Sequence, residues 1–347
     1  MIRPKAATAL KVLAVLAVLG LLCYVLRRIG FRSIISEIGR TPPPALMSAA
    51  LLQLAVFVLW AFRMQLLMRP PERRSILSLF PIYMAGVFGN VVTPGARVGG
   101  EPIRAYYMSA AYGGEKSAYL GTILADKLGN AAVVVGFLVV SLLVVVVLVP
   151  MEALIKAALL TGIALLLVTV VSGALLRKHV NLRSPLLNRL LPAVYHSRLL
   201  KFIRRRFRTY GQFEDYAIRK LDNVFSPIAR AAGSPRSVLK IVVISGGAWL
   251  LFCLLHHVLF LGFGVPIGFP RVIVIVTIST CVGDVSMSPG GAGFMEGAML
   301  ALCAAFGITA QTAAAVTLIS RGIFYGFALG AGGASLAGLS LIFGRRK

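Results

Sequence analysis

The chain has 347 residues, of which 58% are hydrophobic and 14% charged, and its formal net charge is +25. So apolar a composition excludes a soluble globular protein and predicts a polytopic, all-α integral membrane protein. A high positive charge in a soluble chain suggests a nucleic-acid partner, but here the basic residues gather at the ends of apolar runs. That pattern fits membrane topology and anionic lipid better, so we expect no nucleic-acid partner.

Apolar runs follow one another along the chain, and most are long enough to span a bilayer as helices. In the first part they lie at Ala9–Leu26, Ala45–Leu67, Ile76–Val92, Ala105–Tyr112 and Tyr119–Val149. In the second part they lie at Ala153–Leu176, Val238–Phe263, Val272–Val285, Ala298–Ile308 and Ala313–Phe343. The sequence therefore predicts two series of helices of similar order.

Two stretches interrupt these series, TPGARVGGEPIRAYYM at 93–108 and SPGGAGFMEGAMLALC at 288–303. Proline and clustered glycines free backbone groups that hydrocarbon cannot hydrogen-bond, so protein or water must surround them. Both stretches place a glutamate seven residues after a proline, and a basic residue follows the glutamate at nearly equal distance, Lys127 in one and Arg321 in the other. We interpret 1–150 and 151–347 as two structural repeats.

Each repeat has an interrupted pair of short helices before its last long span. If each pair is a re-entrant hairpin, the two repeats have inverted topology, whereas two full crossings give parallel repeats. The arms before each break are short, which favours the hairpin. Both versions place the N-terminus and the C-terminus in the cytoplasm, at a cell membrane.

The segment 177–240 carries fifteen Lys and Arg residues against three acidic residues. We expect it to be a cytoplasmic insertion in the second repeat that includes a basic amphipathic helix on an anionic membrane surface.

Charged residues inside membrane segments cost about 2.5–3.5 kcal/mol on insertion scales and are functional candidates. We expect the cations to bind a phosphate, the glycines to let backbone N–H groups approach it, and the carboxylates to orient the cations or take up protons. The equally open alternative is a set of structural ion pairs, Glu101 with Lys127 and Glu296 with Arg321. The candidate substrate-binding residues are Arg97, Gly99, Gly100, Glu101, Arg104, Asp126, Lys127, Pro289, Gly290, Gly291, Glu296 and Arg321.

Other polar features favour structural roles. Arg63 can snorkel to the nearby cytoplasmic edge, adjacent His256 and His257 have poor metal-ligand geometry, and a glycine every four residues from Gly322 to Gly330 predicts close helix contact. The sequence shows no nucleophile with a base, no phosphate-binding loop and no dinucleotide turn. We therefore expect no enzyme activity, no cofactor and no metal.

The interrupted stretches also carry a resemblance. NVVTPGARVGGEPIRAYYM with ADKLGN, and SMSPGGAGFMEGAML with FGIT and LISRGIFYG, resemble the two signatures of the lysylphosphatidylglycerol synthase transmembrane, or flippase-like, family. The resemblance extends from about residue 10 to 343. It implies a membrane part that moves an aminoacylated phospholipid between leaflets, here without the soluble synthase domain.

The chain departs from the family pattern where Ala96 and Gly100 flank the Arg97 region, and where Asp126 and Lys127 replace a Glu-Arg pair. The Gly-Gly-Glu-Pro form resembles the stand-alone branch associated with glycosyltransferases and polyprenyl-linked sugars. The expected function is translocation of a membrane lipid, either an anionic phospholipid or a polyprenyl-phosphate lipid. The rivals are a small-solute secondary transporter and a non-transporting partner of a lipid-modifying enzyme or glycosyltransferase.

Overall fold

The computed structural model describes residues 36, 39, 41–68, 75–93, 99–148, 191, 192, 195, 207, 209–286 and 293–344. Every regular element in this part is an α-helix, which confirms the all-α prediction. Four of the helices are long and apolar enough to cross a membrane: α3 (Pro43–Leu67), α6 (Lys116–Leu148), α11 (Pro235–Gly262) and α14 (Ala310–Phe343). The predicted spans at 9–26 and 153–176, like Arg97, Pro289, Gly290 and Gly291, lie outside the described residues.

Helix starts follow local chemistry. Ser75, Ser234 and Thr309 each accept a hydrogen bond from a backbone N–H of the first turn, which satisfies one of the donors that a helix start leaves without a partner. Proline occupies an early position of α3 and α11, where the missing N–H costs nothing.

The described helices form two series of the same order. The first series is α3, α4 (Ile76–Val92), α5 (Gly100–Tyr112) and α6, and the second is α11, α12 (Phe269–Val285), α13 (Phe294–Ala305) and α14. α4 and α12 both have 17 residues, α5 and α13 have 13 and 12, and α6 and α14 have 33 and 34.

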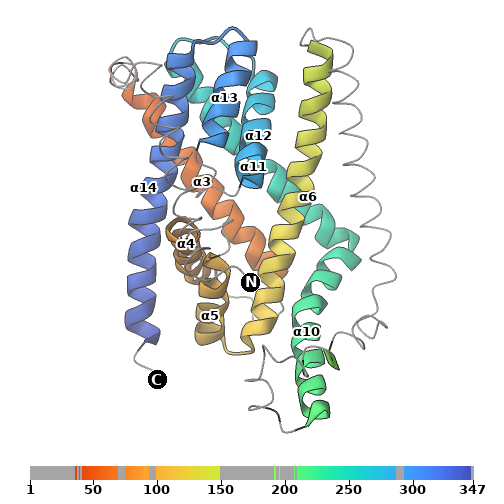
Figure 1. Ribbon diagram of the computed structural model, residues 1–347. Coiled ribbons are helices and arrows are strands. Elements are labelled where there is room, and N and C mark those ends of the chain that lie inside the picture. Colours follow the sequence, from red (N-terminus) through yellow and green to blue (C-terminus); the bar gives the residue numbers. More distant parts are fainter. Residues whose placement is uncertain are drawn as a thin grey trace, which may run out of the picture.

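The two series run in opposite directions. α6 rises from the lower end of the molecule to the upper end, whereas α14 descends to the lower end (Figure 1). The pair α4 and α5 lies in the lower half, and the pair α12 and α13 lies in the upper half. α3 and α11 cross between them as an antiparallel pair, because a β-carbon added to Gly262 at the end of α11 would lie 2.9 Å from Cβ of Ala45 at the start of α3.

Glycines allow α4 and α5 to approach backbone to backbone. A β-carbon on Gly100 would overlap the carbonyl oxygen of Gly86, and one on Gly89 would lie 3.1 Å from Cα of Gly100. The first short pair is therefore packed more tightly than side chains on both helices would permit.

The helix α10 (Tyr210–Gly233) packs along the first half of α6. A β-carbon on Gly121 would collide with the backbone at Asn223 and Val224, so this contact is also close. Lys220 and Asn223 both donate hydrogen bonds to the Glu115 carboxylate in the turn before α6, the second at 2.9 Å. α10 is amphipathic and carries three acidic and three basic residues, so it has no net positive charge of its own. The basic run before residue 207 lies outside the described residues.

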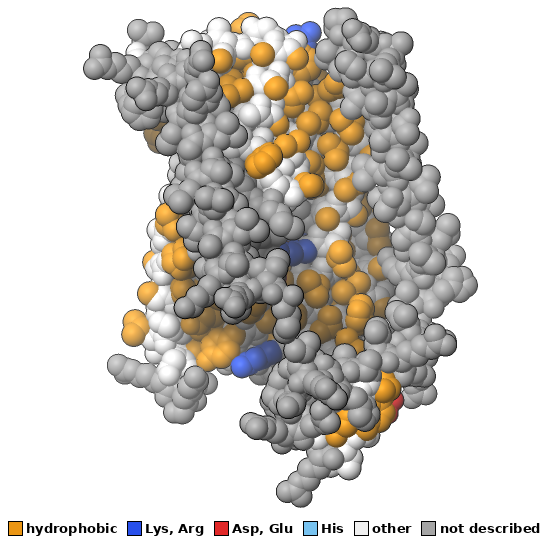
Figure 2. Space-filling model, in the orientation of Figure 1, with side chains coloured by type: hydrophobic (Ala, Val, Ile, Leu, Met, Phe, Trp, Pro, Cys, Tyr) orange, Lys and Arg blue, Asp and Glu red, His pale blue; other side chains and the backbone are white. Residues whose placement is uncertain are grey.

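The surface of the described helices is largely hydrophobic. Figure 2 shows a face covered by hydrophobic side chains in which Lys and Arg surface at few points. Large apolar side chains such as Leu51, Val147, Val243 and Leu341 are more than half exposed. Such a surface suits hydrocarbon rather than water.

We predict that Gly100→Ala destabilises the protein by about 1–3 kcal/mol, because the added methyl group must separate α4 from α5. The matched control is Gly136→Ala in α6, where a β-carbon meets nothing within 4 Å of the described structure. That change should stabilise by about 0.5–1 kcal/mol, since alanine favours the helix. Unfolding of both variants in mixed detergent micelles measures this, and equal effects of the two substitutions would contradict the packing.

We also predict that low pH weakens the contact of α10 with the turn before α6. The hydrogen bonds from Lys220 and Ser117 hold the pKa of Glu115 below its usual 4.5. A lowered pKa means that the carboxylate stabilises the docked state above pH 4.5 and that this contribution is lost as the pH falls through the lowered value. The protection of residues 210–233 against hydrogen exchange, relative to the intrinsic rate at each pH, should therefore fall at low pH. Glu115→Gln should show the faster exchange already at pH 7, and unchanged exchange in that variant would refute the coupling.

Candidate functional site

The first candidate site lies where α4 ends and α5 begins. Glu101 is in the first turn of α5, where the partial positive charge of the helix start favours a carboxylate. Its Oε1 lies 2.5 Å from Nζ of Lys127 on α6, and the Asn90 amide donates to the same oxygen at 3.4 Å. The Glu101 side chain is 4% exposed and the Lys127 side chain 38%. The carboxylate is thus inside the protein while its cation reaches the surface.

The Asn90 side chain also closes the break. Its Oδ1 accepts the backbone N–H of Gly100 at 2.7 Å, which is one of the donors that the start of α5 would otherwise leave without a partner.

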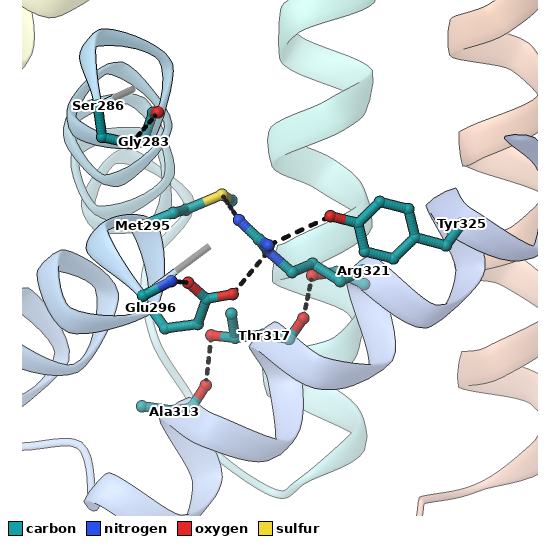
Figure 3. Close-up of polar contacts among 10 residues, drawn as sticks. Gly283, Ser286, Met295, Glu296, Ala313, Thr317, Arg321 and Tyr325 are labelled. Atoms are coloured by element: carbon teal, nitrogen blue, oxygen red, sulfur yellow. Dashed lines mark hydrogen bonds and ion pairs between the residues drawn. The ribbon is translucent and has the colours of Figure 1, made fainter. Parts of the chain in front are cut away.

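The second candidate site lies where α12 ends and α13 begins (Figure 3). Glu296 is in the first turn of α13, and its Oε2 accepts the backbone N–H of Gly293 at 2.7 Å. Its Oε1 lies 2.9 Å from Nε of Arg321 on α14. The Arg321 guanidinium also donates to the Tyr325 hydroxyl at 3.4 Å and lies 3.2 Å from the Met295 sulfur.

The two sites are equivalent in the two series. In each, a glutamate in the first turn of a short helix pairs with a cation on the following long helix. Both cations lie eleven residues beyond the first residue of their helix, Lys127 in α6 and Arg321 in α14. The structure therefore contains both ion pairs that the sequence suggested as structural locks.

Arg63 does not snorkel, and that interpretation of the sequence is wrong. Its side chain is 3% exposed, and its guanidinium makes a two-point contact with Asp126 on α6, at 2.6 Å and 3.1 Å. The same guanidinium donates to Asn130 at 2.6 Å and to Ser245 on α11 at 2.9 Å. Arg63 thus joins α3, α6 and α11.

Among the described residues, the second series has no equivalent of the Asp126 contact on its last long helix. Asp126 precedes Lys127, but the residue before Arg321 is Ser320, whose hydroxyl donates to Thr317 of its own helix at 3.0 Å. Asp126 forms an ion pair with Arg63, whereas its sequence neighbour Lys127 forms an ion pair with Glu101.

Arg104 is a buried cation with an aromatic partner. It is 3% exposed, and its guanidinium carbon lies 3.9 Å from the centroid of the Tyr83 ring. Its Nε has no hydrogen-bond partner in the described structure. The side chain runs directly over Gly86, where any β-carbon would collide with it. α4 therefore makes room for this arginine by carrying a glycine.

The remaining candidates divide clearly. Gly99 and Gly100 lie within the tight contact of α4 with α5, as the packing alternative requires. The glycines at 322, 326 and 330 meet nothing within 4 Å in the described structure, so their predicted close contact is absent there. The part of the chain that the structure describes contains no cluster of His, Cys, Asp or Glu fit to hold a metal ion.

Sequence reasoning missed Tyr83 and Asn90 and assigned Arg63 wrongly. The available signal was polarity. Arg63 lies inside an apolar span, and Asn90 lies four residues before Pro94 of the first interrupted stretch, so each needs a partner within the membrane. Their partners lie on other helices, and spacing does not reveal them.

Comparison with known proteins identifies relatives along nearly the whole chain. The family model described as the lysylphosphatidylglycerol synthase TM region matches residues 10–332. Two UPF0104 membrane proteins of Methanothermobacter thermautotrophicus are 23% and 27% identical to this chain, covering 89% and 84% of it and 90% and 82% of their own lengths. A UPF0104 membrane protein of Methanocaldococcus jannaschii is 26% identical, covering 92% of this chain and 90% of its own length.

We predict that Asp126→Asn destabilises the protein by about 3–5 kcal/mol, because it leaves the Arg63 charge buried without a carboxylate. The control is Asp222→Asn, the same change at an exposed position of α10, for which we expect about 0.5 kcal/mol or less. The free energies of unfolding of both variants, measured in mixed detergent micelles, provide the comparison. Similar decreases in the two variants would mean that the Arg63 network contributes little to stability.

Proposed function

Because the chain belongs to the family of the lysylphosphatidylglycerol synthase TM region, we propose that it is a membrane protein that translocates an anionic lipid, a phospholipid or a polyprenyl-phosphate lipid. The headgroup passes between the two broken helix pairs while the acyl or prenyl chains stay in the bilayer. The observation that carries this proposal is the repeated ion pair at the two breaks.

The depth of the pairs supports the proposal. Eleven residues of helix correspond to about 16 Å, roughly half of a hydrocarbon core of about 30 Å. If α6 and α14 begin at opposite membrane surfaces, as their opposite directions in Figure 1 suggest, both cations lie near the midplane. α4 and α5 then enter from one surface and α12 and α13 from the other, as inverted re-entrant hairpins.

Two cations are suited to meet a phosphate there. Lys127 is part-exposed although its carboxylate is buried, so a headgroup reaches the ammonium without first entering the core. Arg104 lies on the same hairpin one turn beyond Glu101, and its described partner is an aromatic ring rather than a carboxylate. A guanidinium in that state gains more from a phosphate oxygen than one already neutralised does.

The orientation follows from charge. The C-terminal end of α14 and the docked helix α10 lie at the same end of the molecule. We propose that this end is cytoplasmic, because α10 belongs to the segment 177–240, whose sequence is rich in Lys and Arg.

A charge swap tests the proposal. The double variant Glu101→Lys, Lys127→Glu keeps the ion pair but moves the cation into the hairpin, away from the surface. In liposomes with headgroup-labelled anionic phospholipid, zwitterionic phospholipid and polyprenyl phosphate in parallel, wild type should move one anionic class. The swap variant should fold and move that lipid at least about tenfold more slowly than wild type. This corresponds to a barrier to translocation that is higher by about 1.4 kcal/mol.

The control is Arg271→Met, which removes an exposed cation at the start of α12 and should leave the rate unchanged. A folded swap variant that moves lipid at the wild-type rate would show that the pair only holds the hairpin. A folded wild type that moves none of the three lipids would overturn the proposal and favour a partner of a lipid-modifying enzyme.

A further inference from the structure

His256 is a buried imidazole with one open nitrogen. It is fully buried in α11, and its Nδ1 lies 2.9 Å from the carbonyl oxygen of Phe252. A carbonyl only accepts, so Nδ1 carries the proton and Nε2 is left as an acceptor. Nε2 has no partner in the described structure.

Gln53 on α3 is the second such group. It is also fully buried, and both its amide nitrogen and its amide oxygen lack partners among the described residues. An amide offers donors to the acceptor on His256 and an acceptor for a second ligand.

The helix registers bring these groups to one level. The antiparallel contacts of Gly262 with Ala45 and of Ser245 with Arg63 place Gln53 beside the turn of α11 that contains His256. Ser245 faces α3, and His256 follows it by eleven residues, or about three turns, so both lie on the same side of α11.

The same level contains the second ion pair. Phe57 packs on Phe324 of α14 with ring centroids 5.6 Å apart, and α3 and α14 run in the same direction. One turn earlier on each helix lie Gln53 and Ser320, next to Arg321. Thr317 lies beside Glu296 in Figure 3. Gln53 therefore lies at about the level of Ser320, the residue before Arg321 of the second ion pair.

Buried polar atoms without partners cost free energy, and such a group calls for a water, an ion or a functional role to explain it. One imidazole nitrogen and one amide are too few ligands for a metal ion, but they suit a water or a proton. We propose that His256, assisted by Gln53, binds the proton that accompanies an anionic headgroup through this protein. The inference rests on the proposed function and names its driving force.

The coupling is electrostatic. A proton on Nε2 adds one positive charge to the protein interior, which favours a bound anion, and a bound anion favours the proton to the same degree. Charged and titratable groups on the surrounding elements include His257 and Cys253 on α11, Arg63 on α3, Asp126 and Lys127 on α6, Arg271, Cys281 and Asp284 on α12, Cys303 and Glu296 on α13, and Arg321 and Tyr325 on α14. Arg63, Asp126, Lys127, Glu296 and Arg321 are held in ion pairs. Nδ1 of His257 also lacks a partner in the described structure, but His257 is only partly buried, whereas His256 is fully buried and its Nε2 is open.

The experiment places protein in liposomes with labelled anionic phospholipid and imposes a difference of one pH unit between inside and outside. A one-proton coupling shifts the lipid distribution between leaflets by up to about tenfold per pH unit. We expect this shift in wild type and its loss in His256→Phe and in Gln53→Leu. Both variants should fold, since each replaces a side chain with an unpartnered buried polar atom by an apolar side chain. The control His257→Phe, one residue along on a different side of α11, should keep the shift.

If lipid crosses in wild type but its distribution does not depend on the pH difference, the proton site is wrong and the proposed translocation still holds. The same conclusion follows if the distribution in His256→Phe still shifts with the pH difference. If no lipid crosses in wild type under any pH condition, the proposed function is overturned and this inference falls with it.

Discussion

A chain that breaks a helix within hydrocarbon must supply partners for the backbone groups that the break frees. Both breaks do so with side chains of the first or last turn. Asn90 accepts the N–H of Gly100 at one break, and Glu296 accepts the N–H of Gly293 at the other. Glu296 also holds Arg321, so at the second break one side chain satisfies the backbone and positions the charge. At the first break Asn90 satisfies the backbone and also donates to Glu101, which holds Lys127.

The two series of helices differ in how they are held together. α6 is joined to α3 and α11 through the Arg63 network, whereas Ser320 offers α14 no such connection. α14 has its ion pair with α13, but it contacts α3 and α4 by packing, such as the approach of Gly332 to the carbonyl of Met84 and the contact of the Phe324 ring with the Phe57 ring. Apolar contacts permit sliding at less cost than a buried charge pair permits separation, so the α14 side is the better candidate for movement.

Sequence reasoning predicted the helices within a few residues, because apolar runs bounded by Pro, Ser and Thr determine where a membrane helix begins and ends. Ile76–Val92 agrees at both ends, whereas the start of α5 falls five residues before the predicted Ala105, because Gly100 and Glu101 are helical. Matched spacing also found both ion pairs. It failed at Arg63, whose partner Asp126 lies 63 residues away on a helix whose neighbours no local pattern reveals.

If the protein translocates a lipid as proposed, the ion pairs limit how strongly the headgroup can bind. A phosphate that approaches Lys127 or Arg321 competes with a carboxylate oxygen that lies 2.5 Å or 2.9 Å from the cation. The net binding free energy of the phosphate is therefore the difference between the cation's attraction to phosphate and its attraction to the carboxylate. A site that must release what it binds needs such a small difference, since tight binding at the midplane would trap the lipid. Arg104 has no carboxylate partner in the described structure, so in the proposed function it would supply the net attraction for the headgroup. Attraction and release would then depend on different cations, Arg104 on α5 and Lys127 on α6.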